Sequence, residues 1–153
     1  MTVEPADVGT TDRAAGRRRR APSGYADWWS MDLRLWWRDF DGYGHLTATA
    51  YPVICAEAIG QFMADVWGVP DPHFVVADLG VTYLREVRRA ESTVRVYVGI
   101  ARVGRSSFEA EIVLCTADGE VASVAETRYS AWDPDGRRSR PLTSAERSAL
   151  LSC

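Results

Sequence analysis

The stretch RDFDGYGHLTATAY, residues 38–51, gathers reactive side chains just before a long apolar segment. It holds two carboxylates, Asp39 and Asp41, and His45, one of the two histidines of the chain. A carboxylate at the mouth of a buried segment is costly unless it is hydrogen-bonded or has a chemical task. Such a group attacks a carbonyl carbon as a nucleophile, or it removes a proton from an attacking water molecule. We therefore expect the chemistry of this protein in the loop formed by residues 39–45.

The start of the helix expected after this loop offers the complementary chemistry. The first N–H groups of a helix have no partner within it, and together with the helix dipole they favour an oxyanion. A carbonyl group held between one of these two carboxylates and the helix start would meet both a nucleophile or base and a site for negative charge. In the simpler interpretation, Asp39 and Asp41 only cap turns in a glycine-rich loop.

Length and composition restrict the class of protein. The 153 residues suit one domain, and 46% hydrophobic with 25% charged residues is an ordinary globular composition. The net charge of −3 argues against nucleic acid as the main partner. The three cysteines are widely spaced and suggest neither disulfides nor a zinc site, so we expect a reducing cytoplasm and no metal or redox cofactor. The longest apolar segment is interrupted by Glu57, Gln61 and Asp65, which argues against a membrane span.

Hydrophobic periodicity predicts the elements that position the loop. Residues 1–27 have no apolar period and are predicted to form a disordered arm that includes Arg17–Arg20. Residues 30–38 alternate as a strand does, with Met31, Leu33, Leu35 and Trp37 on the buried face. Residues 48–67 are apolar on most sides, which is typical of a buried helix.

Four further strands are predicted over residues 73–85, 92–103, 108–116 and 120–132. A short final helix should begin at Thr143–Glu146, which resembles a capping box. One long helix followed by antiparallel strands predicts an α+β fold, with the helix on one face of a curled sheet of about five strands.

The order of these elements and several local patterns resemble hot-dog fold thioesterases of the 4-hydroxybenzoyl-CoA thioesterase type. The family pattern is Asp-x-x-Gly-His with an aromatic residue ten positions after the aspartate, and Asp41, Gly44, His45 and Tyr51 match it. Tyr83, the turn GRSS at residues 104–107 and the segment DGRRSRPL at residues 135–142 resemble later parts of the pattern. The resemblance covers about residues 30–145. It implies a hot-dog domain over residues 28–145, followed by a tail over residues 146–153.

The resemblance implies an enzyme that hydrolyses an acyl-CoA or acyl carrier protein thioester. Asp41 is then the nucleophile or general base, whereas Asp39 is structural. Glu57 is a second candidate, because one branch of these thioesterases takes its catalytic carboxylate from the helix. The backbone N–H of Ala48 would face the thioester carbonyl, and Gly44 would let the backbone approach the substrate.

Further roles follow from the same resemblance. His45 either polarises the carbonyl or holds its own loop. Tyr51 either contacts the substrate or packs in the core. The family binds the phosphates of coenzyme A where this chain has Arg105, Arg138 and Arg140, and guanidinium groups suit phosphate oxygens. The resemblance also implies a homodimer or homotetramer with the site between subunits.

Two departures from the family pattern leave an alternative function open. Many members have two asparagines where this chain has Thr47 and Ala48, and many have an arginine where it has Ile59. The alternative is a non-catalytic hot-dog protein that binds acyl-CoA or an acyl carrier protein. A hot-dog dehydratase would need a histidine and a carboxylate in other motifs, which the sequence does not contain.

Overall fold

The computed structural model describes residues 20–153. Of the N-terminal arm predicted for residues 1–27, residues 1–19 therefore lie outside the described residues. The two α-helices are α1 (Ala50–Trp67) and α2 (Ser144–Leu151). The strands are β1 (Trp29–Arg34), β2 (Phe74–Tyr83), β3 (Thr93–Val103), β4 (Ser107–Cys115), β5 (Val121–Asp133) and β6 (Arg138–Ser139). Two short 3-10 helices, η1 (Tyr25–Asp27) and η2 (Trp37–Asp39), flank β1.

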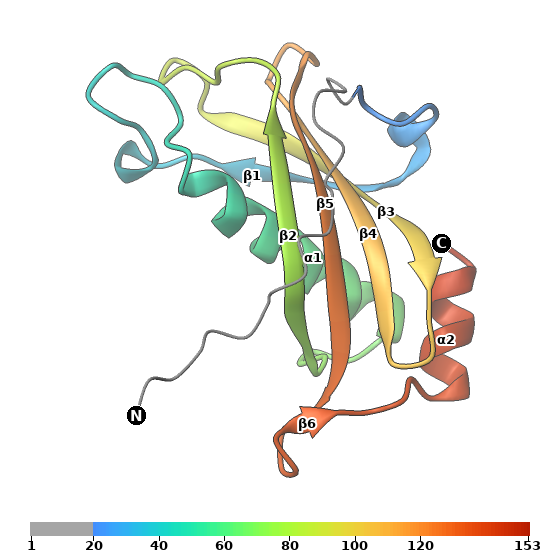
Figure 1. Cartoon of the computed structure of the whole chain (residues 1–153). Coiled ribbons are helices and arrows are strands. Elements are labelled where there is room, and N and C mark those ends of the chain that lie inside the picture. The colour runs from blue at the N-terminus through green and yellow to red at the C-terminus, as the bar shows by residue number, and fades with distance from the viewer. Residues whose placement is uncertain (1–19) are drawn as a thin grey trace, which may run out of the picture.

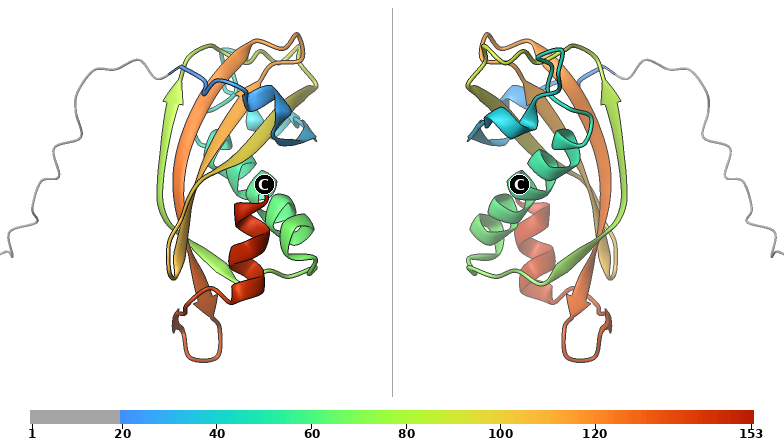
Figure 2. Two further views of the ribbon diagram at one scale, coloured as in Figure 1. Left: turned by 90° about the vertical axis from the view of Figure 1, so that its right-hand side faces the viewer. Right: turned by 90° about the vertical axis from the view of Figure 1, so that its left-hand side faces the viewer.

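The strands form one antiparallel sheet that curls around α1 (Figure 1). The strand order is β1-β3-β4-β5-β2, and the short β6 pairs with the end of β5. Both helices lie on the same side of the curved sheet (Figure 2). The α+β prediction is confirmed, as are the long helix and the four later strands, whose ends differ by at most two residues from those expected.

The core lies between the concave face of the sheet and α1. Side chains alternate along a strand, so every second residue of β3 faces the helix, and Val94, Val96 and Val98 are fully buried. On α1 the side chains of Phe62 and Met63 have none of their surface exposed. This packing fixes α1, and with it the loop that enters the helix.

The strand predicted for residues 30–38 is shorter than expected, because β1 ends at Arg34. The Asp39 carboxylate accepts a hydrogen bond from Trp36 N at 2.7 Å and stabilises η2. This turn breaks the alternation of the strand. Leu33 and Leu35 are buried as predicted, but Trp37 is 75% exposed, so its assignment to the buried face was wrong.

Residues 25–28 pack on the outer face of the sheet. The Tyr25 ring meets the Tyr97 ring edge-to-face at 5.2 Å between centroids. The Trp28 indole covers Gly99, where an added Cβ would lie 2.5 Å from the ring. The arm boundary expected at residue 27 therefore falls inside a segment that packs on the sheet.

The C-terminal segment is also part of the packed structure. Thr143 and Glu146 form the predicted capping box at the start of α2. Leu150 is 1% exposed and belongs to the core, and α2 packs against β3 and α1. The expected boundary between the domain and a tail at residues 145–146 therefore falls inside a helix.

Candidate active site

The Asp41 carboxylate is held by its own loop. Its Oδ1 accepts hydrogen bonds from Tyr43 N at 2.8 Å and from His45 N at 3.0 Å. Donation by these backbone N–H groups, His45 first, lowers the pKa of Asp41 below its ordinary value. Both bonds end on Oδ1 rather than Oδ2. Asp41 therefore does cap a turn, as the simpler interpretation expects, and it does so as a solvent-accessible, ionised carboxylate.

The loop folds back on itself at Gly44. Gly44 N donates to Asp41 O at 3.1 Å, and Asp41 N donates to His45 O at 2.9 Å. Gly44 has a φ of 81°, in the left-handed region where a side chain is strained. Glycine is therefore required here by the shape of the turn that holds Asp41.

His45 is exposed, and a close polar contact links it to the segment after β2. Its Nε2 lies 2.8 Å from Glu86 Oε2, and Glu86 also pairs with Arg88. His45 thus has the geometry of a residue that orders its own loop, one of the two roles predicted for it. Glu86 was not singled out from the sequence, because no local pattern links it to a loop forty residues earlier.

The entry to α1 places backbone donors next to this loop. Thr47 N donates to Asp39 O at 2.8 Å, whereas the N–H of Ala48 has no acceptor among the described residues. The Tyr83 hydroxyl donates to Ala48 O at 3.3 Å. Tyr51 is 3% exposed, lies edge-to-face with Tyr83, and has its pKa raised to about 12 by burial. Tyr51 is thus packed against Tyr83 in the core, and the Ala48 N–H lies two residues before the start of α1.

A groove of about 640 Å³ runs between the end of β1 and the first turns of α1. Its lining includes Trp36, Asp39, Thr47, Thr49, Val53 and Glu57. The groove brings Asp39 and the second candidate carboxylate, Glu57, to one surface. Asp41 and His45 do not line this groove. In the single chain, the two candidate catalytic carboxylates, Asp41 and Glu57, therefore do not share one groove.

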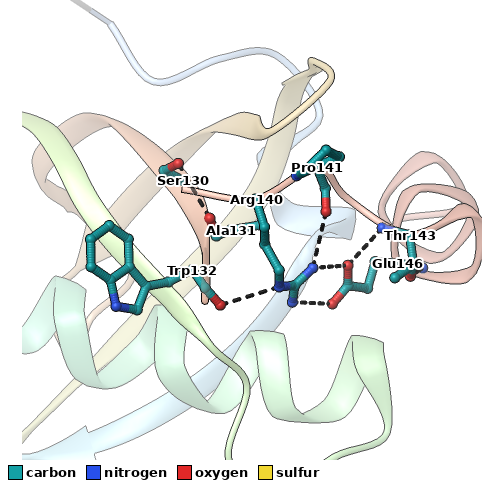
Figure 3. A network of polar contacts seen from close by, with 7 residues as sticks. All are labelled: Ser130, Ala131, Trp132, Arg140, Pro141, Thr143 and Glu146. Carbon is teal, nitrogen blue, oxygen red and sulfur yellow. Dashed lines mark hydrogen bonds and ion pairs between the residues drawn. The ribbon is translucent and has the colours of Figure 1, made fainter. Parts of the chain in front are cut away.

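Arg140 is occupied within the chain (Figure 3). Its guanidinium forms two hydrogen bonds to the Glu146 carboxylate, at 2.7 and 2.8 Å, and its Nε donates to Trp132 O at 3.2 Å. The same pair lowers the pKa of Glu146. These contacts fasten the segment after β6 to the start of α2. Arg105 and Arg138 are exposed and retain donors for a phosphate.

β6, which contains Arg138, and the β3–β4 turn, which contains Arg105, lie at the opposite end of the sheet from the loop of residues 39–45 (Figure 1). The segment after β2 runs beside the Asp41 loop, and Leu84 N in this segment donates to Ala122 O. The Asp41 loop therefore lies near the start of β5. β6 pairs with the end of β5, where Ala131 N also bonds Ser106 O in the β3–β4 turn. The 13 residues of β5 span about 40 Å. One chain therefore does not bring the predicted phosphate site to Asp41.

Within residues 20–153, no three His, Cys, Asp or Glu side chains are grouped so that they could hold a metal ion. Neither of the two α-helices in this part of the chain has the length and apolar character of a membrane span.

Comparisons with solved structures identify the fold. The chain superposes on a thioesterase from Thermus thermophilus, complexed with coenzyme A and Zn, with a TM-score of 0.71 and 26% identity, covering 80% of this chain and 91% of the other. A Staphylococcus aureus protein in complex with CoA gives a TM-score of 0.73 at 16% identity, covering 80% and 81%. A 1,4-dihydroxy-2-naphthoyl-CoA thioesterase from Synechocystis gives 0.67 at 14% identity, covering 80% and 94%. The latter two identities are low enough that these likenesses show the fold alone.

Sequence comparison adds the family. No curated protein matches the chain. The sequence pattern of the thioesterase-like superfamily, however, matches residues 35–150, which includes the Asp41 loop, α1 and the whole sheet from β2 onward. The resemblance seen in the sequence is thus confirmed, together with the hot-dog fold. The chain belongs to the thioesterase-like superfamily.

Proposed function

We propose that this protein is a thioesterase that hydrolyses an acyl-CoA or acyl carrier protein thioester to a free acid and a thiol. Two observations support the proposal: an ionised Asp41 held by its loop, and the Ala48 N–H, which lies two residues before α1 and has no acceptor among the described residues. The first supplies a nucleophile or base, and the second supplies a donor for the oxyanion.

The reaction follows from these two groups. With Asp41 as general base, a water oxygen attacks the thioester carbon while the carboxylate takes the proton. The tetrahedral oxyanion is stabilised by the Ala48 N–H and the helix dipole, and it collapses with loss of the thiolate, which takes the proton from the Asp41 carboxyl group. With Asp41 as nucleophile, its carboxylate displaces the thiolate to form a mixed anhydride, and water then cleaves the anhydride to the free acid and the regenerated Asp41 carboxylate, with the proton passing to the thiolate. The replacement of asparagine by Ala48 keeps the main-chain donor in either route.

A second copy of the chain would complete the site. β2 is an edge strand, and exposed edges favour pairing with another strand. An antiparallel β2–β2 pair about a two-fold axis would place the β6 end of one copy beside the Asp41 end of the other. The partner's exposed arginines would then supply the phosphate contacts that one chain does not bring to Asp41.

The test is thiol release from short, long and aromatic acyl-CoAs by the wild type and by Asp41→Asn. We expect kcat/KM to fall by roughly a hundredfold or more in this variant, which removes the charge but keeps the shape. Asp39→Asn and Glu57→Gln are the matched controls, because they neutralise the two other carboxylates of the site.

Other outcomes would redirect the proposal. Activity that survives Asp41→Asn and is lost in Glu57→Gln would move catalysis to the groove. A folded wild type that binds acyl-CoA but releases no thiol, from acyl-CoA or from an acyl carrier protein, would support the non-catalytic alternative.

A further inference from the structure

The segment formed by residues 86–89 follows β2 and lies alongside the loop that carries Asp41. Leu46 N donates to Val87 O at 2.8 Å, and Arg89 N donates to Gly44 O at 2.9 Å. Val87 is fully buried, so this segment is itself anchored in the core. The Asp41 loop is thereby tied to a fixed part of the protein at two main-chain positions.

The Arg89 side chain adds a third tie, at Asp41 itself. Its Nη2 donates to Asp41 O at 3.0 Å, the same carbonyl that accepts from Gly44 N. Arg89 therefore contacts both ends of the turn, Asp41 through its side chain and Gly44 through its backbone. Its bond ends on the main-chain oxygen, so the Asp41 carboxylate remains available to a substrate.

The exposed Trp37 holds the Arg89 guanidinium in this position. The guanidinium carbon lies 5.1 Å from the centroid of the Trp37 ring, within the range of a cation–π contact. A planar guanidinium stacked on an aromatic ring keeps its in-plane donors free for hydrogen bonds. This contact gives a role to a tryptophan that is 75% exposed.

We propose that Arg89 is a positioning residue for Asp41. Its guanidinium, steadied by Trp37, holds the turn from residue 41 to residue 44 in the shape in which Tyr43 N and His45 N point at the Asp41 carboxylate. The inference rests on the proposed function in one respect, that Asp41 is the reacting carboxylate. The role is geometric, since Arg89 acts through the loop and contacts no reacting atom.

The kinetic test compares Arg89→Ala and Arg89→Lys with Arg85→Ala. Arg85 belongs to the same connection, but its side chain pairs with Glu120 and its N–H donates to Ala122 O, so it is the matched control. We expect Arg89→Ala to lower kcat by about tenfold with little change in KM, because orientation and not substrate binding is lost. Arg89→Lys keeps a cationic donor and should recover part of kcat.

The pH profile separates positioning from general stability. If the two N–H groups no longer point at Asp41, its ionised form loses that stabilisation and its pKa rises. The acid limb of kcat/KM should therefore move to higher pH in Arg89→Ala and stay in place in Arg85→Ala. An acid limb and a kcat that are unchanged in folded Arg89→Ala would overturn the proposal, as would equal effects in Arg85→Ala.

A second measurement does not depend on activity. Hydrogen exchange of the Tyr43 and His45 amides, followed by NMR, should accelerate by about tenfold in Arg89→Ala and remain unchanged in Arg85→Ala. If the wild type hydrolyses no thioester, the proposed function fails and this experiment still tests the loop. Unchanged exchange of these two amides in Arg89→Ala would overturn the inference whatever the activity. Thermal unfolding verifies that each variant is folded, and Arg89→Met, which also removes the donors to Asp41 O but keeps an unbranched side chain, replaces Arg89→Ala if that variant does not fold.

Discussion

Asp41 is the residue on which the proposed chemistry depends, and its surroundings set the pH range in which it is ionised. Hydrogen bonds from His45 N and Tyr43 N lower its pKa below the ordinary value of about 4. A carboxylate that acts in its ionised form loses activity only as the pH falls through its own pKa. We therefore expect kcat/KM for an acyl-CoA to stay level from about pH 7 to about pH 5 and to reach half its value below about pH 4.

The control for this profile is the fold itself, followed by tryptophan fluorescence at each pH. The lowered pKa also favours the folded state above the unfolded-state pKa, and this contribution is lost as the pH falls through the folded-state pKa. Activity and fold are thus predicted to persist over the same range. A midpoint of the acid limb above about pH 5, with the protein still folded, would show that another group with a higher pKa controls the reaction.

The three cysteines differ enough in exposure to be told apart by a thiol reagent. Burial raises the pKa of Cys55 to about 12 and raises that of Cys115, and both side chains are nearly inaccessible. Cys153 is exposed near the end of α2. We expect one fast-reacting thiol in the native protein and three after denaturation, because only an exposed thiolate reacts rapidly.

Cys153→Ser should remove the fast reaction and also lower the background of a thiol-release assay. A fast reaction that persists in Cys153→Ser would mean that Cys115 is accessible. Its Sγ donates to the Tyr25 hydroxyl at 3.8 Å, so that result would show that residues 25–28 leave the sheet in solution.

At the scale of elements, the Arg140–Glu146 pair decides how α2 is fastened. Glu146 caps the helix through Thr143 N and binds Arg140 through both carboxylate oxygens. The pair is largely shielded, with 28% and 17% of the two side chains exposed. We expect Glu146→Ala to lower the free energy of unfolding by about 2 kcal/mol, because a helix cap and a charge-assisted pair are lost together.

Arg138→Ala is the matched comparison with Arg140→Ala. The Arg138 side chain is 78% exposed, and its contact with Asp133 is long, at 3.5 Å. Its removal should therefore change the free energy of unfolding little. We predict that Arg140→Ala reduces stability with little effect on KM for acyl-CoA, whereas Arg138→Ala raises KM at unchanged stability. Urea unfolding and steady-state kinetics measure the two effects. A raised KM in Arg140→Ala at full stability would return this arginine to the phosphate site.

At the scale of the whole molecule, the proposed site needs two copies. Val76 lies on the edge strand β2 and is 58% exposed, an apolar surface that pairing would cover. We expect the wild type to run as a dimer or larger oligomer in light scattering after gel filtration. Val76→Lys should dissociate it, because charged side chains oppose edge-to-edge pairing. Thiol release should fall with the oligomer.

Val69→Lys is the control for this experiment, since Val69 is also exposed but lies after α1 and outside β2. A wild-type monomer that releases thiol at full rate would show that one chain suffices. The phosphates of coenzyme A would then have to contact residues other than Arg105 and Arg138.

Some features of this protein follow from local sequence. The apolar residues of α1 and the alternating apolar residues of β3 are the ones that become buried. The helix and the four later strands were therefore predictable one segment at a time. The capping box at Thr143 is likewise local. The pattern of Asp41, Gly44 and His45 is local too, because a turn that bonds its own amides depends on residues a few positions apart.

Other features depend on segments that meet only in the folded chain. Trp37 follows the alternation of β1, yet the turn stabilised by Asp39 directs it to solvent and toward Arg89. Arg140 belongs to an arginine-rich segment that suggested phosphate binding, but the fold places Glu146 within reach of it. The sequence by itself determined the elements and the turn that holds the Asp41 carboxylate, because those depend on neighbouring residues. Only the tertiary structure decided which arginines are free and what holds Asp41 in place, because those depend on contacts across many residues of chain.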